Sequence, residues 1–144
     1  MAFTTSLYNH TVKKLLGGEI SFANLKVMLL DNNAVFGAAH TTLVDVLAGL
    51  ATEVSGNGWT AGGMAVASVV STVTTTNDGT LSASELRVRA TGGSIGPAYA
   101  LVIFDDLAAG DAPILYIDFG GALTAGNGTD FLVPLNSGFI TGAY

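Results

Sequence analysis

The stretch AYALVIFDDLAAGDAPILYIDF, residues 98–119, holds the features that decide the fold. Its two apolar runs, 98–104 and 114–119, are short and rich in β-branched and aromatic residues, which is typical of buried strands. Residues 105–113 between them contain aspartate, glycine and proline, which favour turns. The stretch therefore predicts two strands joined by a turn-rich loop.

Further strand-like segments lie on both sides of this pair. Residues 66–76 (VASVVSTVTTT) are dense in β-branched residues, and residues 81–90 alternate between apolar and polar positions. Between them, Asn77-Asp78-Gly79 predicts a hairpin, because Asp-Gly readily adopts the positive φ angles of a tight turn. Short strands are also expected over 131–135 and, at an edge, over 139–141. Strands at this spacing predict an antiparallel β-sandwich or barrel.

The N-terminal third is expected to add short helices. Apolar residues recur at helical spacing over 6–16 (SLYNHTVKKLL), with Ser6 as a suitable N-cap and Gly17-Gly18 at the end. Residues 24–30 (NLKVMLL) follow as a buried strand. A second helix is expected over 42–51, capped by Thr41 or Thr42, with one apolar face made by Leu43, Val46, Leu47 and Leu50.

The predicted fold class is thus mainly β, with one or two short helices in the N-terminal third. We expect a single domain over 1–144, with an N-terminal helix or arm over 1–20 and a β core over 64–144.

Composition narrows the classes of function. Only 11% of the 144 residues are charged, 49% are hydrophobic, and the net charge is −6. The acidic balance argues against nucleic acid or an anionic membrane surface as the main partner. The sequence has no run of about 18 apolar residues that would span a membrane as a helix. The chain contains no cysteine, which excludes disulfides, thiol catalysis and cysteine-bound metals.

The glycine-rich segment 53–63 (EVSGNGWTAGG) superficially resembles a phosphate-binding loop. A dinucleotide-binding loop follows a strand and opens a helix, whereas this segment follows a predicted helix and precedes a strand. We therefore interpret it as a tight turn whose glycines allow Trp59, the only tryptophan, to fold back onto the sheet.

No pattern predicts a catalytic centre or a cofactor. His10 and His40 are thirty residues apart, and neither has a neighbouring carboxylate at metal-ligand spacing. We expect His10 to lie on a helix surface. Ser94 sits among glycines but lacks the spacing of a nucleophile elbow. The chain is therefore predicted not to be an enzyme and to bind no metal or cofactor.

The aspartates of the central loop leave two interpretations. Asp105, Asp106 and Asp111 would offer oxygen ligands to a hard cation, but they lack EF-hand spacing. We favour a solvated loop in which these aspartates initiate turns.

Three charged residues are candidates for contacts between subunits. Asp118 lies between Ile117 and Phe119 in a predicted strand, so its carboxylate should face away from both. Arg87 and Arg89 share one face of another strand. An intersubunit ion pair between Asp118 and one of these arginines is the sharper hypothesis, and a solvated carboxylate is the simpler one.

The predicted exterior favours association. Outward positions such as Thr72, Thr74 and Thr76 carry small uncharged side chains instead of lysine and glutamate. Low surface charge promotes association, and closed symmetric assemblies are its usual form.

Several motifs in fixed order support this view: YNH at 8–10, KLLGGEI at 14–20, LKVMLL at 25–30, EVSGNGWTAGG at 53–63 and LYIDFGG at 115–121. Together they resemble a family of small virion structural proteins of tailed bacteriophages, over nearly the whole chain. Trp59 stands where that family usually has tyrosine.

The resemblance implies a head decoration (cement) protein that stabilises the major capsid lattice. It further implies a homotrimer on the capsid exterior, assembled in the host cytoplasm, with the major capsid protein as partner. Aromatic side chains often anchor interfaces, so Phe3, Tyr8 and Trp59 are the candidate anchors.

Two alternatives remain. One is a tail, collar or fibre-adaptor component of the virion. The other is a receptor- or glycan-binding module, for which Tyr99, Tyr116 and Tyr144 are scattered candidate contacts.

Overall fold

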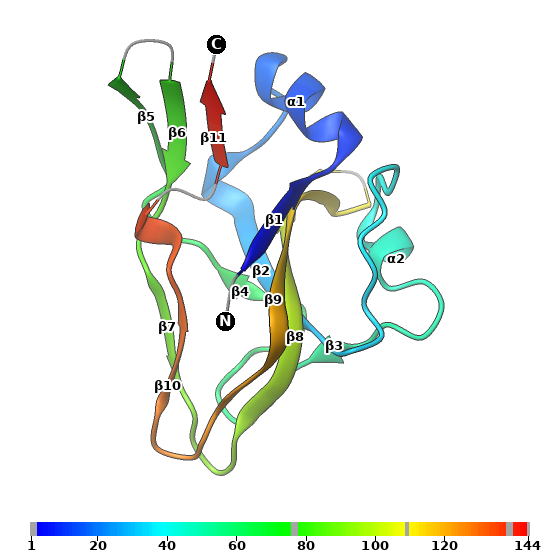
Figure 1. The fold of residues 1–144 in the computed structure, drawn as a ribbon, viewed down its shortest axis with the longest axis vertical. Coiled ribbons are helices and arrows are strands. Elements are labelled where there is room, and N and C mark those ends of the chain that lie inside the picture. Colours follow the sequence, from blue (N-terminus) through cyan, green and yellow to red (C-terminus); the bar gives the residue numbers. More distant parts are fainter. Residues whose placement is uncertain (1–2, 76–77, 109, 138–139, 144) are drawn as a thin grey trace.

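The computed structural model describes residues 3–75, 78–108, 110–137 and 140–143 (Figure 1). The chain is mainly β, and its sheets are antiparallel, as the sequence predicts. The helices are α1 (Asn9–Leu16), η1 (Phe22–Asn24), α2 (Leu43–Val46) and η2 (Leu135–Ser137). The strands are β1 (Thr4–Leu7), β2 (Leu25–Leu30), β3 (Glu53–Val54), β4 (Met64–Ala65), β5 (Val70–Thr75), β6 (Asp78–Ser82), β7 (Leu86–Arg89), β8 (Ile95–Asp105), β9 (Ala112–Ala125), β10 (Asp130–Val133) and β11 (Ile140–Ala143).

The main sheet is centred on the hairpin β8–β9. Its strand order is β1-β9-β8-β2-β3, and β4 also pairs with β2. In the hairpin, Leu101 lies opposite Ile117 and Ile103 opposite Leu115. The two apolar runs that predicted strands therefore pair with each other, and the predicted strand after residue 24 is β2 beside them.

Both faces of this sheet are buried at its centre, which explains why its strands read as continuous apolar runs. One face contributes to a cluster that we call the inter-sheet core, built around Val27, Leu29, Trp59, Val88, Leu101, Ile103, Leu115, Phe119 and Phe131. The opposite face contributes to a second core made of Tyr8, Met28, Leu30, Leu43, Val46, Ala100, Val102, Phe104 and Tyr116.

Different elements cover the two faces. Strands β7 and β10 pair with each other, and β11, β6 and β5 form a further sheet. Val88 of β7, Phe131 of β10 and Leu81 of β6 all enter the inter-sheet core, so these small sheets form the second layer of a sandwich (Figure 1). The opposite face is covered by α2 and by partly buried residues of the loop before it, such as Phe36.

The N-terminal helix prediction is corrected at its start. Ser6 does not cap a helix, because it lies in β1 opposite Tyr116 of β9. The helix begins after Tyr8, whose backbone is extended, and α1 ends at Leu16 with Gly17 as its C-cap, as predicted. The first two residues of the predicted helix, Ser6 and Leu7, thus belong to a strand because β9 offers them a hydrogen-bonding partner.

The second predicted helix is much shorter than expected. Helix α2 has four residues, and the chain leaves it before Gly49, which has φ +76°. Leu50, which was expected on the buried face, is consequently exposed. Thr42 does cap the helix, as the sequence predicts.

The strand predicted over 81–90 is divided between two sheets. Residues 78–82 form β6, whereas 86–89 form β7 in the other small sheet. Strand β6 pairs with β5 as the predicted hairpin requires, but the predicted turn is wrong in its position, because Asp78 and Gly79 lie within β6, opposite Thr75 and Val73. Between them, the N–H of Ala83 donates to the carbonyl of Leu135, which turns the chain from one sheet to the other. Asn77 and Phe139 lie outside the described residues, as do the side chains of Thr74 and Thr76; Thr72 is exposed.

Candidate functional site

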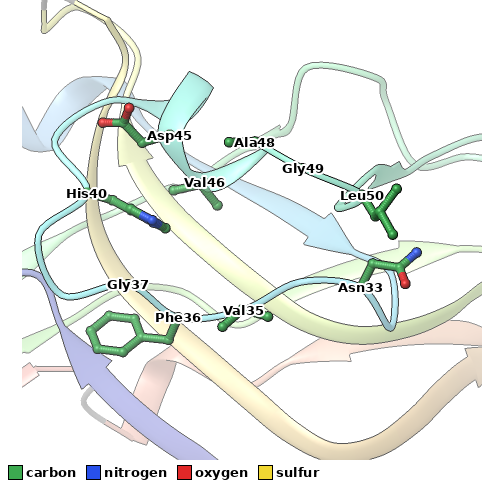
Figure 2. Close-up of a pocket in the computed structure, with 10 residues that line it drawn as sticks. All are labelled: Asn33, Val35, Phe36, Gly37, His40, Asp45, Val46, Ala48, Gly49 and Leu50. Carbon is green, nitrogen blue, oxygen red and sulfur yellow. The ribbon is translucent and has the colours of Figure 1, made fainter.

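A hollow lies on the side of the molecule that carries α2. Its volume is about 480 Å³. As Figure 2 shows, it is enclosed by the loop after β2, by α2 and by the turn that follows α2. We call this site the hollow; it is lined by Asn33, Val35, Phe36, Gly37, His40, Asp45, Val46, Ala48, Gly49 and Leu50.

The residues that line the hollow lie within the segment 31–52, and Asp31 fixes the start of this segment. Its carboxylate accepts hydrogen bonds from the N–H and hydroxyl of Thr52, at 3.2 and 2.7 Å, and from the N–H of Asn33 at 3.1 Å. Burial would raise the pKa of Asp31, but the hydrogen bonds from Thr52 and Asn33 outweigh it and hold the pKa below its usual value. The two ends of the 31–52 segment are thereby tied together.

Asp45 fixes the start of α2. Its carboxylate accepts the N–H groups of Thr41 and Thr42, both at 3.0 Å, while the Thr42 hydroxyl accepts the N–H of Asp45 at 3.2 Å. This reciprocal capping box satisfies donors that a helix start leaves unpaired. The N–H bonds from Thr41 and Thr42 lower the pKa of Asp45. The N–H of Leu43 donates to the carbonyl of Gly110 at 2.9 Å, which joins α2 to the β8–β9 loop.

The imidazole of His40 forms one wall of the hollow. It folds over Gly37, where a Cβ atom would overlap the ring. Tyr8 lies nearby and stacks on His40 at a ring-centroid distance of 6.3 Å. Phe36 packs against Tyr8 at 5.1 Å and against Tyr116 at 5.6 Å, so a row of aromatic rings supports the hollow from the second core.

Two polar atoms in this aromatic row are buried without a hydrogen-bond partner among the described residues: the hydroxyl of Tyr8 and Nδ1 of His40. Burial, with a smaller contribution from Tyr116, raises the pKa of Tyr8. A neutral phenol in this position suits a packing role.

The rim of the hollow is aliphatic and exposed. Val35 and Leu50 both line the hollow, and their exposed fractions are 72% and 79%. Isolated exposed aliphatic residues are common, but their grouping around a concavity is typical of a contact site. The lining offers few polar groups, so an apolar side chain is the kind of group it suits best.

Most other ionisable groups of the described chain form hydrogen bonds or ion pairs that hold neighbouring segments together. Asp105 is buried and accepts the N–H groups of Ser21 and Leu107, at 2.8 and 3.0 Å. Asp106 pairs with Lys26 at 2.8 Å. The turn interpretation of this loop is therefore confirmed for Asp105, although that carboxylate is buried where a solvated one was expected. Among the described residues, no group of three acidic or histidine side chains is placed to hold a metal ion.

Arg87 and Arg89 lie on the exposed face of β7, as predicted. Arg87 pairs with Asp130 at 2.9 Å and with Glu85 at 3.0 Å, and Arg89 contacts Asp130 at 3.4 Å. The hydrogen bonds that Arg87 donates to the carboxylates of Asp130 and Glu85 raise the pKa of Arg87. Within one chain, these arginines are thus already paired across β7 and β10.

Asp118 projects outward from β9, because Ile117 and Phe119 on either side face the inter-sheet core. This confirms the predicted orientation. Its carboxylate accepts the N–H of Gly120 at 2.8 Å. An ion pair between Asp118 and an arginine of another copy stays a prediction.

The aromatic interface candidates divide into two groups. Phe3 is exposed and packs on Phe119, with ring centroids 5.1 Å apart. Tyr8 and Trp59 are buried, so they are not available as surface anchors in this fold. Trp59 lies against Phe131 at 5.6 Å, which confirms that the glycine-rich turn folds it back into the core.

The remaining candidate residues from the sequence analysis either make structural hydrogen bonds or are at least partly buried, apart from Tyr144. His10 Nε2 donates to the carbonyl of Pro113 at 2.6 Å, so this histidine is partly buried against β9 and not simply on the helix surface. The carbonyl of Ser94 accepts a hydrogen bond from the side chain of Asn57 at 2.7 Å. Tyr116 is buried, Tyr99 is half-buried, and Tyr144 lies outside the described residues.

Sequence reasoning missed the hollow. Its rim residue Val35 lies in a loop that no periodic pattern marks, and helical spacing placed Leu50 on a buried face although it lies in the turn after α2. Gly49 was the one local signal, since a glycine late in a predicted helix often marks its end.

Comparisons of the chain with protein-family models, with curated proteins and with solved structures found no match. Within the described residues, no helix has both the length and the apolar character needed to cross a membrane.

Proposed function

We propose that this chain is a bacteriophage virion structural protein, and specifically a head decoration protein that binds and stabilises the major capsid lattice. In this proposal it sits on the capsid exterior as a homotrimer. The motif order described above supports the phage assignment. The observation that carries the contact role is the hollow with its exposed aliphatic rim of Val35 and Leu50.

The energetics of the hollow favour repeated, weak contacts. Burial of one valine or leucine side chain contributes about 1.5–3 kcal/mol, so the rim of one copy supplies only a few kcal/mol before the cost of association. Several copies linked in one symmetric particle bind far more tightly than one, because each later contact is intramolecular. This kind of contact suits a protein that is repeated on a symmetric lattice.

The small number of charged groups around the hollow also supports a contact role. Interface cores are depleted of charged residues, since an unpaired charge is costly to bury. Among the residues that surround the hollow, only Asp45 is an acid, and its carboxylate is occupied by the capping box. A partner can therefore cover the hollow without stranding a charge.

The test is binding to shells. Purified protein is added to capsid shells that lack it, and co-sedimentation and thermal disruption of the shells are measured. We expect the wild type to bind and to raise the disruption temperature, and Leu50→Asp to lose both effects because it places a carboxylate at the rim.

Leu16→Asp is the matched control, since Leu16 is also exposed but lies on α1, outside the hollow. It should bind like the wild type. Shells whose disruption temperature is the same with and without the wild-type protein would contradict the decoration role, and rings of the protein that attach to tail tubes would favour the tail alternative. Equal binding by Leu50→Asp and wild type would contradict the contact role of the hollow.

A further inference from the structure

Strand β1 is an edge of the main sheet. It pairs with β9 on one side, with Thr4 opposite Asp118 and Leu7 opposite Leu115. In the described part of the chain, no strand pairs with its other side (Figure 1). The backbone groups on that side are therefore free to pair with a further strand.

This edge lacks the features that usually protect edge strands. Proteins discourage edge-to-edge pairing with charged residues, prolines, bulges or very short strands. Strand β7 carries two exposed arginines, β10 carries Asp130, and β3 is two residues long and contains Glu53. Residues 3–7 (FTTSL) contain no charge, proline or glycine.

One face of strand β1 carries apolar side chains that are partly exposed. Thr5 and Leu7 lie opposite Ile117 and Leu115, both of which belong to the inter-sheet core, and Phe3 packs on Phe119 of the same core. Phe3, Thr5 and Leu7 therefore share one face, as strand alternation requires. Phe3 and Leu7 keep exposed fractions of 43% and 37%.

The sequence of this edge complements itself. In an antiparallel pair centred on Thr5, Phe3 of each copy faces Leu7 of the other, and Thr4 faces Ser6. Aromatic–aliphatic pairs and hydroxyl pairs are favourable across strands, and no like charges meet. The same register covers the exposed parts of both Phe3 and Leu7.

We propose that β1 is a self-pairing edge, at which the β1 strand of a second copy adds antiparallel with Thr5 opposite Thr5 and continues the main sheet across a two-fold axis. This contact does not depend on the hollow. In the proposed lattice it would join neighbouring trimers, because a two-fold contact cannot close a three-fold ring.

The absence of cysteine in the chain allows a direct test by disulfide trapping. Residues directly opposite each other in an antiparallel pair have Cα atoms about 4.5–5.5 Å apart, within the range for a disulfide. Thr5→Cys should therefore cross-link to a dimer under mild oxidation. Thr4→Cys should cross-link much more slowly, because two copies of residue 4 lie diagonally, about 7–8 Å apart.

Thr91→Cys gives the background rate, since Thr91 is exposed and lies outside the strands. Faster trapping of Thr5→Cys than of the other two variants supports the register. Equal rates at residues 4 and 5, or a Thr5→Cys rate no higher than background, would overturn it.

A charge exchange tests the same register without a covalent bond. Thr5→Lys and Thr5→Glu should each weaken self-association roughly fivefold, because like charges then lie opposite each other. An equimolar mixture should form mixed dimers more readily than either variant forms its own, as measured by native mass spectrometry. Far-UV circular dichroism of each variant checks that it is folded. A mixture that pairs no better than its components would contradict the proposal.

Discussion

The two faces of the main sheet are covered in different ways. On one face, the small sheets interlock with it and form the inter-sheet core, which holds Trp59, Phe119 and Phe131. On the other, a loop and the four-residue helix α2 cover the sheet and leave the hollow. Strand side chains fill space regularly, whereas a short helix and a loop need individual hydrogen bonds to stay in place. We therefore expect the first face to supply most of the stability, whereas the contact surface that we propose lies on the second.

The largest expected effect is on the inter-sheet core. Trp59→Ala should lower the free energy of unfolding by about 3–5 kcal/mol, because it removes a buried ring and leaves a cavity beside Phe131. Urea denaturation measures the change. Leu50→Ala on the opposite side should change the same quantity by no more than about 0.5 kcal/mol, since Leu50 is exposed. Similar losses for the two variants would remove the distinction between the faces.

A smaller effect is expected where the wall of the hollow touches Gly37. Gly37→Ala would place a methyl group where His40 packs, so the imidazole must move. We expect the free energy of unfolding to fall by about 1 kcal/mol, which is at the low end for overpacking because His40 is only partly buried. Binding to shells should also weaken.

Gly126→Ala is the control, because a Cβ there meets no atom within 4 Å. It should leave stability and binding nearly unchanged. Unaltered shell binding by Gly37→Ala would show that the shape of this wall does not matter.

The capping box gives the next prediction. Thr42→Ala removes the hydroxyl that accepts the N–H of Asp45 and should cost about 1 kcal/mol of stability. Amide hydrogen exchange should show the loss locally, as faster exchange over α2 with β8 and β9 unchanged. Uniformly faster exchange would mean that α2 is not the separately held element described here.

The smallest effect concerns pH. The pKa of Asp45 is lowered by the N–H groups of Thr41 and Thr42, so its contribution to stability is present above the ordinary carboxylate pKa of about 4. This contribution is lost as the pH falls through the lowered pKa of the folded state. The difference in urea midpoint between the wild type and Asp45→Asn should therefore shrink in acid. A constant difference across this range would contradict the role given to the carboxylate.

The elements that form the inter-sheet core could be predicted from the sequence better than the elements around the hollow. The strands 98–104 and 114–119 could be found because both of their faces are buried, and such burial leaves a continuous apolar run. The return of Trp59 to the core could also be predicted, since the glycines beside it indicate a tight turn. These signals are local.

The second face depends on contacts between segments that are distant in sequence. Ser6 belongs to a strand because Tyr116 of β9 lies opposite it, and α2 is held by the carbonyl of Gly110. Helical spacing placed Leu50 on a buried face, but the chain leaves α2 before reaching it. The hollow could not be predicted because it results from these long-range contacts.

The central claim is that the hollow and its aliphatic rim are the surface covered on assembly. Hydrogen exchange of the protein, free and bound to capsid shells, tests it most directly. We predict that residues 33–50 become protected on the shell while β7 and β10, with their paired arginines, exchange as in the free protein. Protection of β7 and β10 with no change over residues 33–50 would contradict the claim.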